Sequence, residues 1–473
     1  MSVNMVAEGG ASSATMPDAS VSEDRVLPGG WYTLWGMLIV TLFAFVDRQL
    51  LTLAAAPIAQ TLKLSDTQLG MLQGLAPAIF SLVAVYPIAW LADRYDRRFV
   101  LGGCLLAWSV GTAACGLAQN YTQLFLATIA IAAGEAALTP IMFSVVPDLF
   151  KGRKRAFANS LQYFFAYVGI SLALALGGAA LGWLGRVHGS LPDALQALEP
   201  WRIAFFIVVL PTPLLLILIM AMRLRRPDTS DAELAGVPEV HSLLPQLRAH
   251  RWAYSFTLGG LGAYLLAFGG FMAWLPVIGA RLFQATPEMN GYAMALASGC
   301  GTIIGVAAGT LLIRSAMARL KARAAIRVCW LIMLFSSPLV LTFLFVNSFN
   351  ALYACFALLM GSGTAIGVLV PTMLQDMAPA PIRARFLAIY SIVAALLSGA
   401  APSIVGVVSD VIGGERSLLV GTVIVALPSW FVATLLLRLA ERHFEELTER
   451  LRERVEGGQG PIGSSSYFGS VKS

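Results

Sequence analysis

Three ionisable residues lie inside long apolar stretches of the sequence: Asp47, Arg48 and Glu135. A charge in an apolar, membrane-spanning segment is costly, and it marks a site that handles ions or substrate. Asp47 and Arg48 are about 100° apart around a helix, so they need not pair with each other. We expect Arg48 to reach Glu135, and at least one of the two carboxyl groups to gain and lose a proton during function. A static ion pair that only joins two helices is the alternative.

The composition indicates that these residues lie in a membrane. The chain of 473 residues is 58% hydrophobic and 12% charged, which is about half the charged fraction of a soluble domain. A soluble protein of this length could not cover its surface with so few polar groups. The sequence therefore predicts an integral membrane protein.

Segments of about 20 apolar residues can cross a bilayer as helices. The sequence contains twelve: 31–58, 68–91, 99–118, 121–146, 156–184, 201–223, 251–275, 289–313, 325–346, 349–372, 384–409 and 416–438. The polar stretch 224–250 predicts a cytoplasmic linker between an N-terminal bundle (31–223) and a C-terminal bundle (251–438). With the N-terminus inside, the inner loops hold far more Lys and Arg than the outer loops, as cytoplasmic loops do. We therefore expect an all-α membrane protein with both termini cytoplasmic, whose net charge of +6 reflects topology and not nucleic-acid binding.

The ends of the chain are expected to lie outside the bundles. Residues 1–30 lack the basic and apolar regions of a secretory signal, so we interpret them as a disordered cytoplasmic arm. The segment 457–473 is interpreted as a disordered tail. Between the last span and this tail, 439–456 has apolar residues at spacings of three and four. This pattern predicts an amphipathic helix on the membrane surface or on the bundle, or a solvated helical extension.

Asp47 and Glu135 fall at similar depths in their predicted spans. A rise of 1.5 Å per residue places Asp47 roughly 22 Å from Tyr32 along the first span, and Glu135 roughly 20 Å from Asp148 along the fourth. No acid or base lies so deep in the spans of the C-terminal half. We therefore assign proton coupling to Asp47 and Glu135, in the N-terminal bundle.

A second group of charges follows the second span, in the sequence AWLADRYDRR at 89–98. It resembles the loop motif of the major facilitator superfamily, G-x-x-x-D-R-x-G-R-R, but has Ala89 and Asp96 where that pattern has glycines. Together with the two sets of six spans, the resemblance covers roughly residues 31–438. It implies the major facilitator fold and alternating access to a site between two bundles.

The same resemblance implies a cytoplasmic gate. In that superfamily the acid of the motif lies at the start of the eleventh span, here near Arg383–Phe386, and its arginines meet an acid that ends the fourth span. Such a gate would hold the inner side shut in an outward-open state. The gate residues expected from it are Asp93, Arg94, Arg97, Asp148 and Arg385.

Four stretches further resemble the Spinster-like transporters of this superfamily. They are FVDR at 45–48, GMLQG at 70–74, ADRY at 92–95, and GEA at 134–136 followed by Pro140. Those transporters usually carry an arginine seven residues before the glutamate, where this chain has Thr128, so Arg48 is its only deep cation. The resemblance implies proton-linked transport of lysophospholipids or sphingoid lipids, with Arg48 as substrate anchor. Proton-coupled drug and organic-anion transporters share several of these features and are the alternative.

Further substrate contacts follow from the superfamily arrangement, in which the first, fourth, seventh and tenth helices face the centre. Besides Arg48, the expected contacts are Thr139, Tyr163, Tyr167, Tyr264, Phe268, Phe271, Trp274, Ser362, Thr364 and Tyr390. An aromatic wall opposite a charged wall suits an amphipathic solute with an anionic head. Each aromatic residue could equally be ordinary helix packing.

The sequence contains no signature of another function class. It lacks a P-loop, a GxSxG motif and a metal set of His and carboxylates, so we expect no enzyme, no metal and no cofactor, with a proton gradient as driving force. The expected partners are a small amphipathic substrate, protons and membrane lipids, for a monomer in a bacterial inner membrane. A membrane sensor that binds ligand without transport is the alternative of another class. The substrate and the direction of transport stay open.

Overall fold

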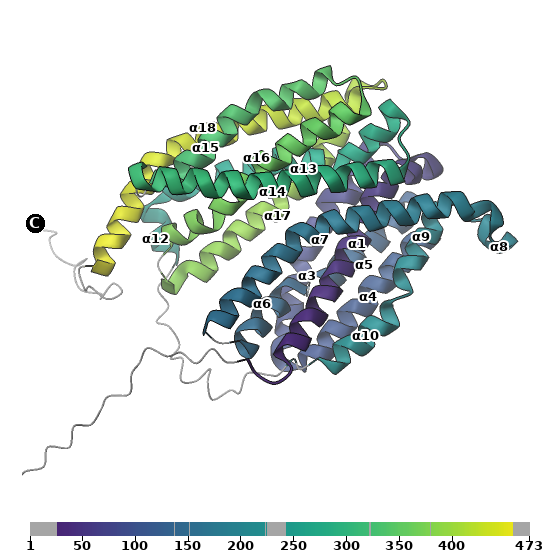
Figure 1. The fold of residues 1–473 in the computed structure, drawn as a ribbon, viewed down its shortest axis with the longest axis horizontal. Helices are drawn as coiled ribbons and strands as arrows, with labels where there is room; N and C mark the ends of the chain where they lie inside the picture. The colour runs from purple at the N-terminus through teal and green to yellow at the C-terminus, as the bar shows by residue number, and fades with distance from the viewer. Residues whose placement is uncertain are drawn as a thin grey trace, which may run out of the picture.

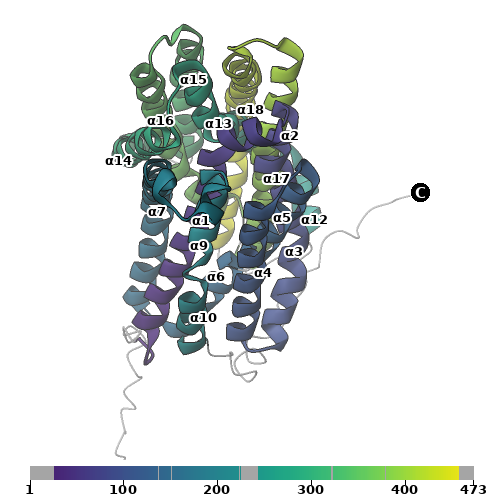
Figure 2. The same ribbon diagram turned by 90° about the vertical axis from the view of Figure 1, so that its right-hand side faces the viewer.

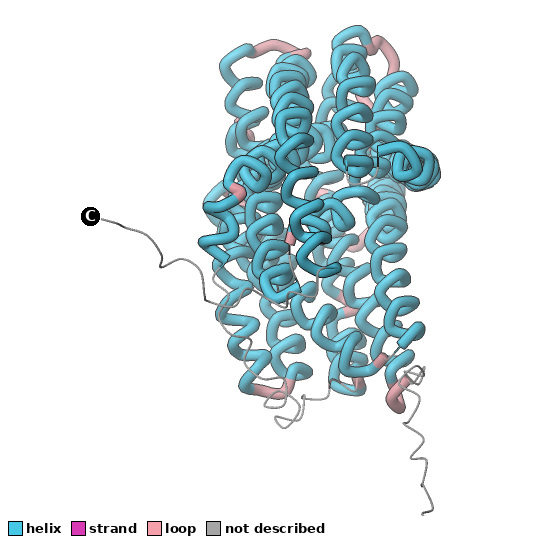
Figure 3. Tube along the Cα trace, turned by 90° about the vertical axis from the view of Figure 1, so that its left-hand side faces the viewer, coloured by secondary structure: helices cyan, strands magenta, loops and turns pink. Residues whose placement is uncertain are grey.

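The computed structural model describes residues 26–136, 138–150, 152–222, 224, 243–320, 323–378 and 380–456. Within this part the chain is helical with short connections (Figure 3), and an isolated bridge pairs Val26 with Phe150. The predicted arm up to residue 25, most of the linker, and the tail 457–473 lie outside the described residues. The all-α fold class is confirmed.

The N-terminal bundle runs from α1 to α10 and the C-terminal bundle from α13 to α18 (Figure 1). The first comprises α1 (Gly30–Leu62), α2 (Asp66–Gly70), η1 (Met71–Leu75), α3 (Ala76–Arg94), α4 (Arg97–Leu117), α5 (Tyr121–Glu135), α6 (Leu138–Leu149), α7 (Gly152–Val187), η2 (His188–Ser190), α8 (Asp193–Gln196), α9 (Pro200–Val209) and α10 (Thr212–Ala221). The second, preceded by α12 (Leu243–Ala249), comprises α13 (Arg251–Phe283), α14 (Pro287–Leu320), α15 (Ala324–Thr342), η4 (Phe343–Phe345), α16 (Phe349–Met377), α17 (Ala380–Ile412) and α18 (Ser417–Glu456).

Eleven helical segments in the described part are long and apolar enough to cross a membrane. Helices suit this role because they satisfy their backbone polar groups internally. The fourth expected span consists instead of α5 and α6, on either side of Ala137, and neither is long enough to span alone. Pro140 contributes to this division, since it has no N–H to donate to the carbonyl of Ala136 four residues earlier.

The last span and the predicted amphipathic segment form one continuous helix, α18. Its final turns pack on the bundle, because Phe444 and Leu447 are fully buried. Glu441 accepts hydrogen bonds from Arg327 Nε at 2.5 Å and Trp330 Nε1 at 2.9 Å, both on α15. Of the alternatives for this segment, the structure therefore shows a helix docked on the C-terminal bundle.

The two most extensive lines of contact between the bundles are α7 against α14 and α2–η1 against α17 (Figure 2). We call the end where α1 begins and α18 ends the basic end, and the opposite end the far end. Both lines lie in the far half: a Cβ at Gly74 would lie 2.2 Å from the carbonyl oxygen of Gly399, and one at Gly178 would lie 2.9 Å from the Cα of Gly291. Figure 1 shows α7 and α14 close together near the far end and well apart at the basic end. The bundles are thus closed against each other at the far end.

Candidate functional site

An ion pair joins α1 and α5 within the N-terminal bundle. Arg48 lies in the middle of α1, and Glu135 is the last residue of α5. Arg48 Nη2 donates a hydrogen bond to Glu135 Oε2 at 2.7 Å. The side chain of Glu135 is 6% exposed, whereas that of Arg48 is 61% exposed. The pair therefore holds a buried carboxylate behind an accessible cation.

Asp47 takes part in a different cluster, on the side of α1 that faces α4. It is 2% exposed, and its Oδ2 accepts hydrogen bonds from Trp108 Nε1 and from Thr112 Oγ1, the second at 2.5 Å. The other oxygen, Oδ1, has no hydrogen-bond partner among the described residues. Because adjacent helical residues point in different directions, the neighbours Asp47 and Arg48 serve two separate polar clusters.

Trp108 and Thr112 did not appear among the predicted site residues. They are four residues apart on α4, which places them one turn apart on the same helix face. Both are buried in the structure. The spacing of a tryptophan and a threonine within an apolar helix was the available signal. It could not show which neighbouring helix that face would meet.

Two residues of the aromatic wall expected on α13, Phe271 and Trp274, lie inside the C-terminal bundle. Phe271 and Trp274 are fully buried. The ring of Phe271 packs on Phe343, with centroids 4.5 Å apart, and Trp274 Nε1 donates to the carbonyl of Pro402 at 3.0 Å. Both side chains thus lie in the core of the C-terminal bundle, because their face of α13 is turned toward α17 and η4. Neither lines a space between the bundles in this conformation.

The other expected contacts of the C-terminal bundle have local partners. Tyr264 is buried with its ring against Trp430, at 5.5 Å between centroids. The hydroxyls of Ser362 and Thr364 donate to carbonyls of their own helix, each at 2.8 Å. Phe268 and Tyr390 are half-buried. As substrate contacts these residues stay predictions, as do Thr139, Tyr163 and Tyr167, whose side chains lie outside the described part.

The expected gate residues lie at the basic end, which is not the closed end here. Arg94 stacks over the ring of Trp90 at 4.1 Å, Arg97 is buried, and Arg385 is exposed. The side chains of Asp93 and Asp148 lie outside the described part. Since the gate was predicted for a state in which the basic end is shut, its pairings stay predictions.

Asp96, which stands where the loop motif has a glycine, is the N-cap of α4. Its backbone is extended, with φ −60° and ψ 122°, a conformation that needs no glycine. Its carboxylate accepts a hydrogen bond from the backbone N–H of Arg98 at 2.9 Å and pairs with the Arg98 guanidinium at 2.6 Å. These bonds from Arg98 hold the pKa of Asp96 below its usual value.

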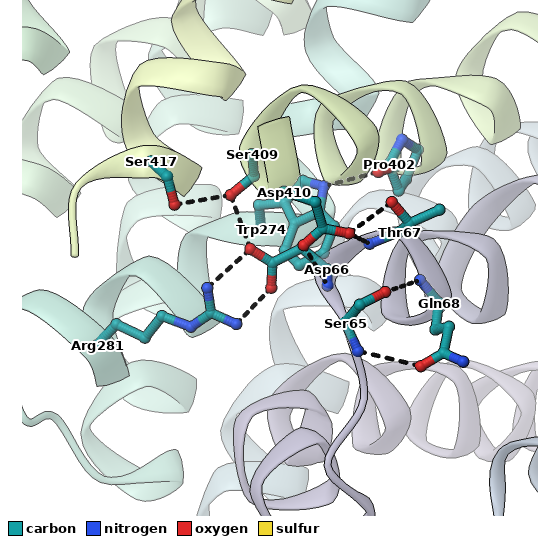
Figure 4. A network of polar contacts seen from close by, with 10 residues as sticks. All are labelled: Ser65, Asp66, Thr67, Gln68, Trp274, Arg281, Pro402, Ser409, Asp410 and Ser417. Carbon is teal, nitrogen blue, oxygen red and sulfur yellow. Dashed lines mark hydrogen bonds and ion pairs between the residues drawn. The ribbon is translucent and has the colours of Figure 1, made fainter. Parts of the chain in front are cut away.

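The far end contains a polar network that joins the bundles (Figure 4). Asp66, at the start of α2, forms an ion pair with Arg281 of α13, in which Nη1 lies 2.9 Å from Oδ2, and also accepts from Ser409 at 2.7 Å. Asp410 of α17 accepts from the backbone N–H groups of Asp66 and Thr67 at 3.0 and 2.8 Å. A carboxylate is stabilised at this position by the free N–H groups of a helix start. We call these five residues the far-end network.

A second ion pair between the bundles lies on the other line of contact. Arg186, in the last turn of α7, donates through Nη1 to Glu288 Oε2 of α14 at 2.5 Å. Residues 37–402, which include Asp47, Arg48 and Glu135, match the family model described as Major Facilitator Superfamily.

Several known proteins are similar to parts of the chain. An MFS-type efflux pump of Mycolicibacterium smegmatis is 30% identical over 211 residues, which are 43% of this chain and 46% of that protein. Protein spinster homolog 1 of Homo sapiens is 26% identical over 251 residues, 50% of this chain and 43% of that protein. The sphingosine-1-phosphate transporter of Danio rerio is 23% identical over 252 residues, 52% and 48% of the two chains. The matches span about half the length of these curated relatives.

Solved structures resemble most of the chain, and one of them illustrates the likeness. It is a bacterial homologue of the human lysosomal transporter Spinster in an inward-facing and unoccupied conformation, with a TM-score of 0.71 and 22% identity. The match covers 93% of this chain and 100% of that one. At this identity the likeness shows the fold, two six-helix bundles, as the sequence predicted.

Proposed function

Since the chain belongs to the major facilitator superfamily and is related to Spinster-type membrane transporters, we propose that it is a proton-linked secondary transporter. The proposed cargo is an amphipathic solute with an anionic head, moved by alternating access. The protons bind at Glu135 and Asp47, and Arg48 anchors the head.

The observation that carries this proposal is the pairing of an accessible guanidinium with a buried carboxylate. Arg48 keeps its charge at all relevant pH values. When Glu135 binds a proton, its carboxylate loses its charge and Arg48 loses its anionic partner. The guanidinium is then free to hold an anionic head, to which it can offer two parallel N–H donors. Proton binding and substrate binding are thereby coupled through one cation.

The closed far end bears on the side of the membrane to which the observed conformation is open. Loops rich in Lys and Arg are cytoplasmic in membrane proteins, which supports an orientation with the basic end toward the cytoplasm. In that orientation, closure at the far end corresponds to an inward-facing state. Alternating access then requires the bundles to separate along both far-end lines of contact and to approach at the basic end. The predicted gate around Asp93 and Arg97 belongs to that second state.

A lipid-like substrate is supported by the relatives. The zebrafish relative is named for sphingosine-1-phosphate, a lipid with a phosphate head, and such a head matches the accessible guanidinium of Arg48. The relative from Mycolicibacterium smegmatis is named as an efflux pump, which favours an organic anion or a drug as the second candidate.

Flux into proteoliposomes tests the proposal. A labelled lysophospholipid, an aromatic organic anion and a cationic dye are offered with and without an imposed pH gradient. We expect the gradient to drive movement of the lysophospholipid by wild-type protein, and Glu135→Gln to lose this response while it retains exchange. Glu441→Gln is the matched control, because Glu441 is also buried against an arginine but lies within the C-terminal bundle.

Three results would contradict the proposal in different ways. A Glu135→Gln variant with the full gradient response removes the proton role of Glu135. Movement of the cationic dye alone removes the anionic substrate. If the protein binds a probe but moves none of the three, it is a sensor and not a carrier.

A further inference from the structure

The cluster around Asp47 contains two donors that the proposed mechanism does not use. Trp108 Nε1 and Thr112 Oγ1 both donate to one carboxylate oxygen, Oδ2, and both come from α4. The three residues are almost completely buried. Two donors on one oxygen fix the rotation of the carboxyl group and stabilise its ionised form. The other oxygen, Oδ1, has no partner among the described residues. It is therefore the oxygen at which a proton can be added.

The charged and titratable groups near Asp47 lie on each side of this cluster. Arg48, its neighbour on α1, donates to Glu135. Glu135 of α5 acts on Asp47 through its charge, and Cys115 of α4 lies close enough for the charge of Asp47 to act on it. Because the guanidinium is bonded to another carboxylate, the neutral donors of α4 are what directly contacts the Asp47 oxygen.

We propose that Trp108 and Thr112 are positioning residues for proton exchange at Asp47: they hold Oδ2 against α4, direct protonation to Oδ1, and set the pH at which it occurs. This inference rests on the proposed function, since it assumes that Asp47 binds and releases a proton. It adds the helix α4 to the residues that act at Asp47. Protonation of Asp47 would weaken both bonds and loosen the contact between α1 and α4.

The test reads the protonation of Asp47 directly and needs no substrate. Infrared spectra of the full chain in liposomes are recorded across a pH titration, and the carboxyl band of Asp47 is identified by its absence in Asp47→Asn. We expect Thr112→Val and Trp108→Phe each to move the titration of this band to higher pH by about one unit, because the ionised form loses a donor. Thr112→Ser retains the donor and is expected to titrate like the wild type.

Two buried residues supply matched controls. Thr128→Val removes a hydroxyl that donates to a carbonyl of its own helix, and Trp430→Phe removes an indole N–H that donates to the carbonyl of Met333. Neither should move the Asp47 band. Thermal unfolding of each variant shows that it is folded. If Thr112→Val or Trp108→Phe does not fold, Thr112→Ala or Trp108→Leu replaces it, because these also remove the donor.

The outcomes separate this inference from the proposed function. If the Asp47 band titrates at the wild-type pH in both Thr112→Val and Trp108→Phe, the positioning role is overturned and proton binding at Asp47 stands. If Asp47→Asn removes no titrating band, Asp47 is not a proton site and the inference falls with that part of the proposed function. An equal shift in the controls would show a general effect of buried substitutions and would also overturn the positioning role.

Discussion

Arg281 of α13 and Asp66 of α2 form an ion pair that joins the two bundles at the far end. Asp66 is almost completely buried, and Arg281 is about one-third exposed. The same carboxylate accepts a hydrogen bond from the Ser409 hydroxyl, and the backbone N–H of Asp66 donates one to the Asp410 carboxylate. Three elements, α2, α13 and α17, therefore meet at this one residue, which contributes to closure at the far end.

Loss of this pair should shift the protein toward a state that is open at the far end. Asp66→Asn or Arg281→Gln removes one partner of a mostly buried pair, at a cost of about 1–3 kcal/mol to the closed state after allowance for solvent at Arg281. Two exposed far-end positions suit spin labels: Ala194 in α8 of the N-terminal bundle and Glu415 between α17 and α18 of the C-terminal bundle. In a cysteine-free variant, the distance between these labels measures the separation of the bundles. We expect a longer distance in both variants. Asp96→Asn, which breaks an ion pair within the N-terminal bundle, should leave the distance unchanged, and equal distances in all four proteins would contradict the role of the pair.

A side chain at Gly74 should prevent closure at the far end. A Cβ there would lie 2.2 Å from the carbonyl oxygen of Gly399, which is closer than any stable contact, so Gly74→Val forces η1 away from α17. We expect the separation between the same labels to increase and transport to fall at least tenfold. Gly103→Val is the control, because a Cβ at Gly103 has open space around it. Normal transport by Gly74→Val would show that the bundles need not approach this closely.

Removal of the Arg48 charge should affect stability and binding in different ways. Arg48→Ala leaves the buried Glu135 carboxylate without its partner, and we expect a loss of about 1–2 kcal/mol, reduced by the exposure of Arg48. The double variant Arg48→Ala, Glu135→Gln should recover this stability but not the binding of a lysophospholipid. Thermal unfolding measures the stability of both variants, and binding isotherms measure their affinity for the lysophospholipid. Wild-type affinity in the double variant would show that Arg48 does not anchor the substrate.

The Asp96 cap should contribute stability that depends on pH. Because bonds from Arg98 lower the pKa of Asp96, its contribution is fully present above the usual carboxyl pKa and is lost as the pH falls through the lowered value. Asp96→Ala should cost about 1 kcal/mol at neutral pH. The difference in Tm between Asp96→Ala and wild type should shrink toward zero in acid. A difference that is constant with pH would show that the carboxylate does not act as the cap.

Much of the fold could be predicted from the sequence, because hydropathy and charge act locally. Apolar runs of spanning length must become helices in lipid, and the Lys and Arg bias predicts which loops face the cytoplasm. The fourth span shows the limit of this argument. Its hydropathy is continuous, but the described helices on either side of Ala137 are α5 and α6. Pro140 lacks a backbone N–H for a helical hydrogen bond, a property that hydropathy does not register.

For the site, the sequence by itself determined which residues are ionisable at depth, since a charge in an apolar helix is visible without coordinates: Asp47, Arg48 and Glu135. The tertiary structure decided how they are divided. The rotation of α1 about its axis points Arg48 toward Glu135 and Asp47 toward Trp108 and Thr112. The rotation of α13 places Phe271 and Trp274 in the core of the C-terminal bundle. Which face of a helix meets which neighbour depends on the packing of all the helices together, and that is a property of no single segment.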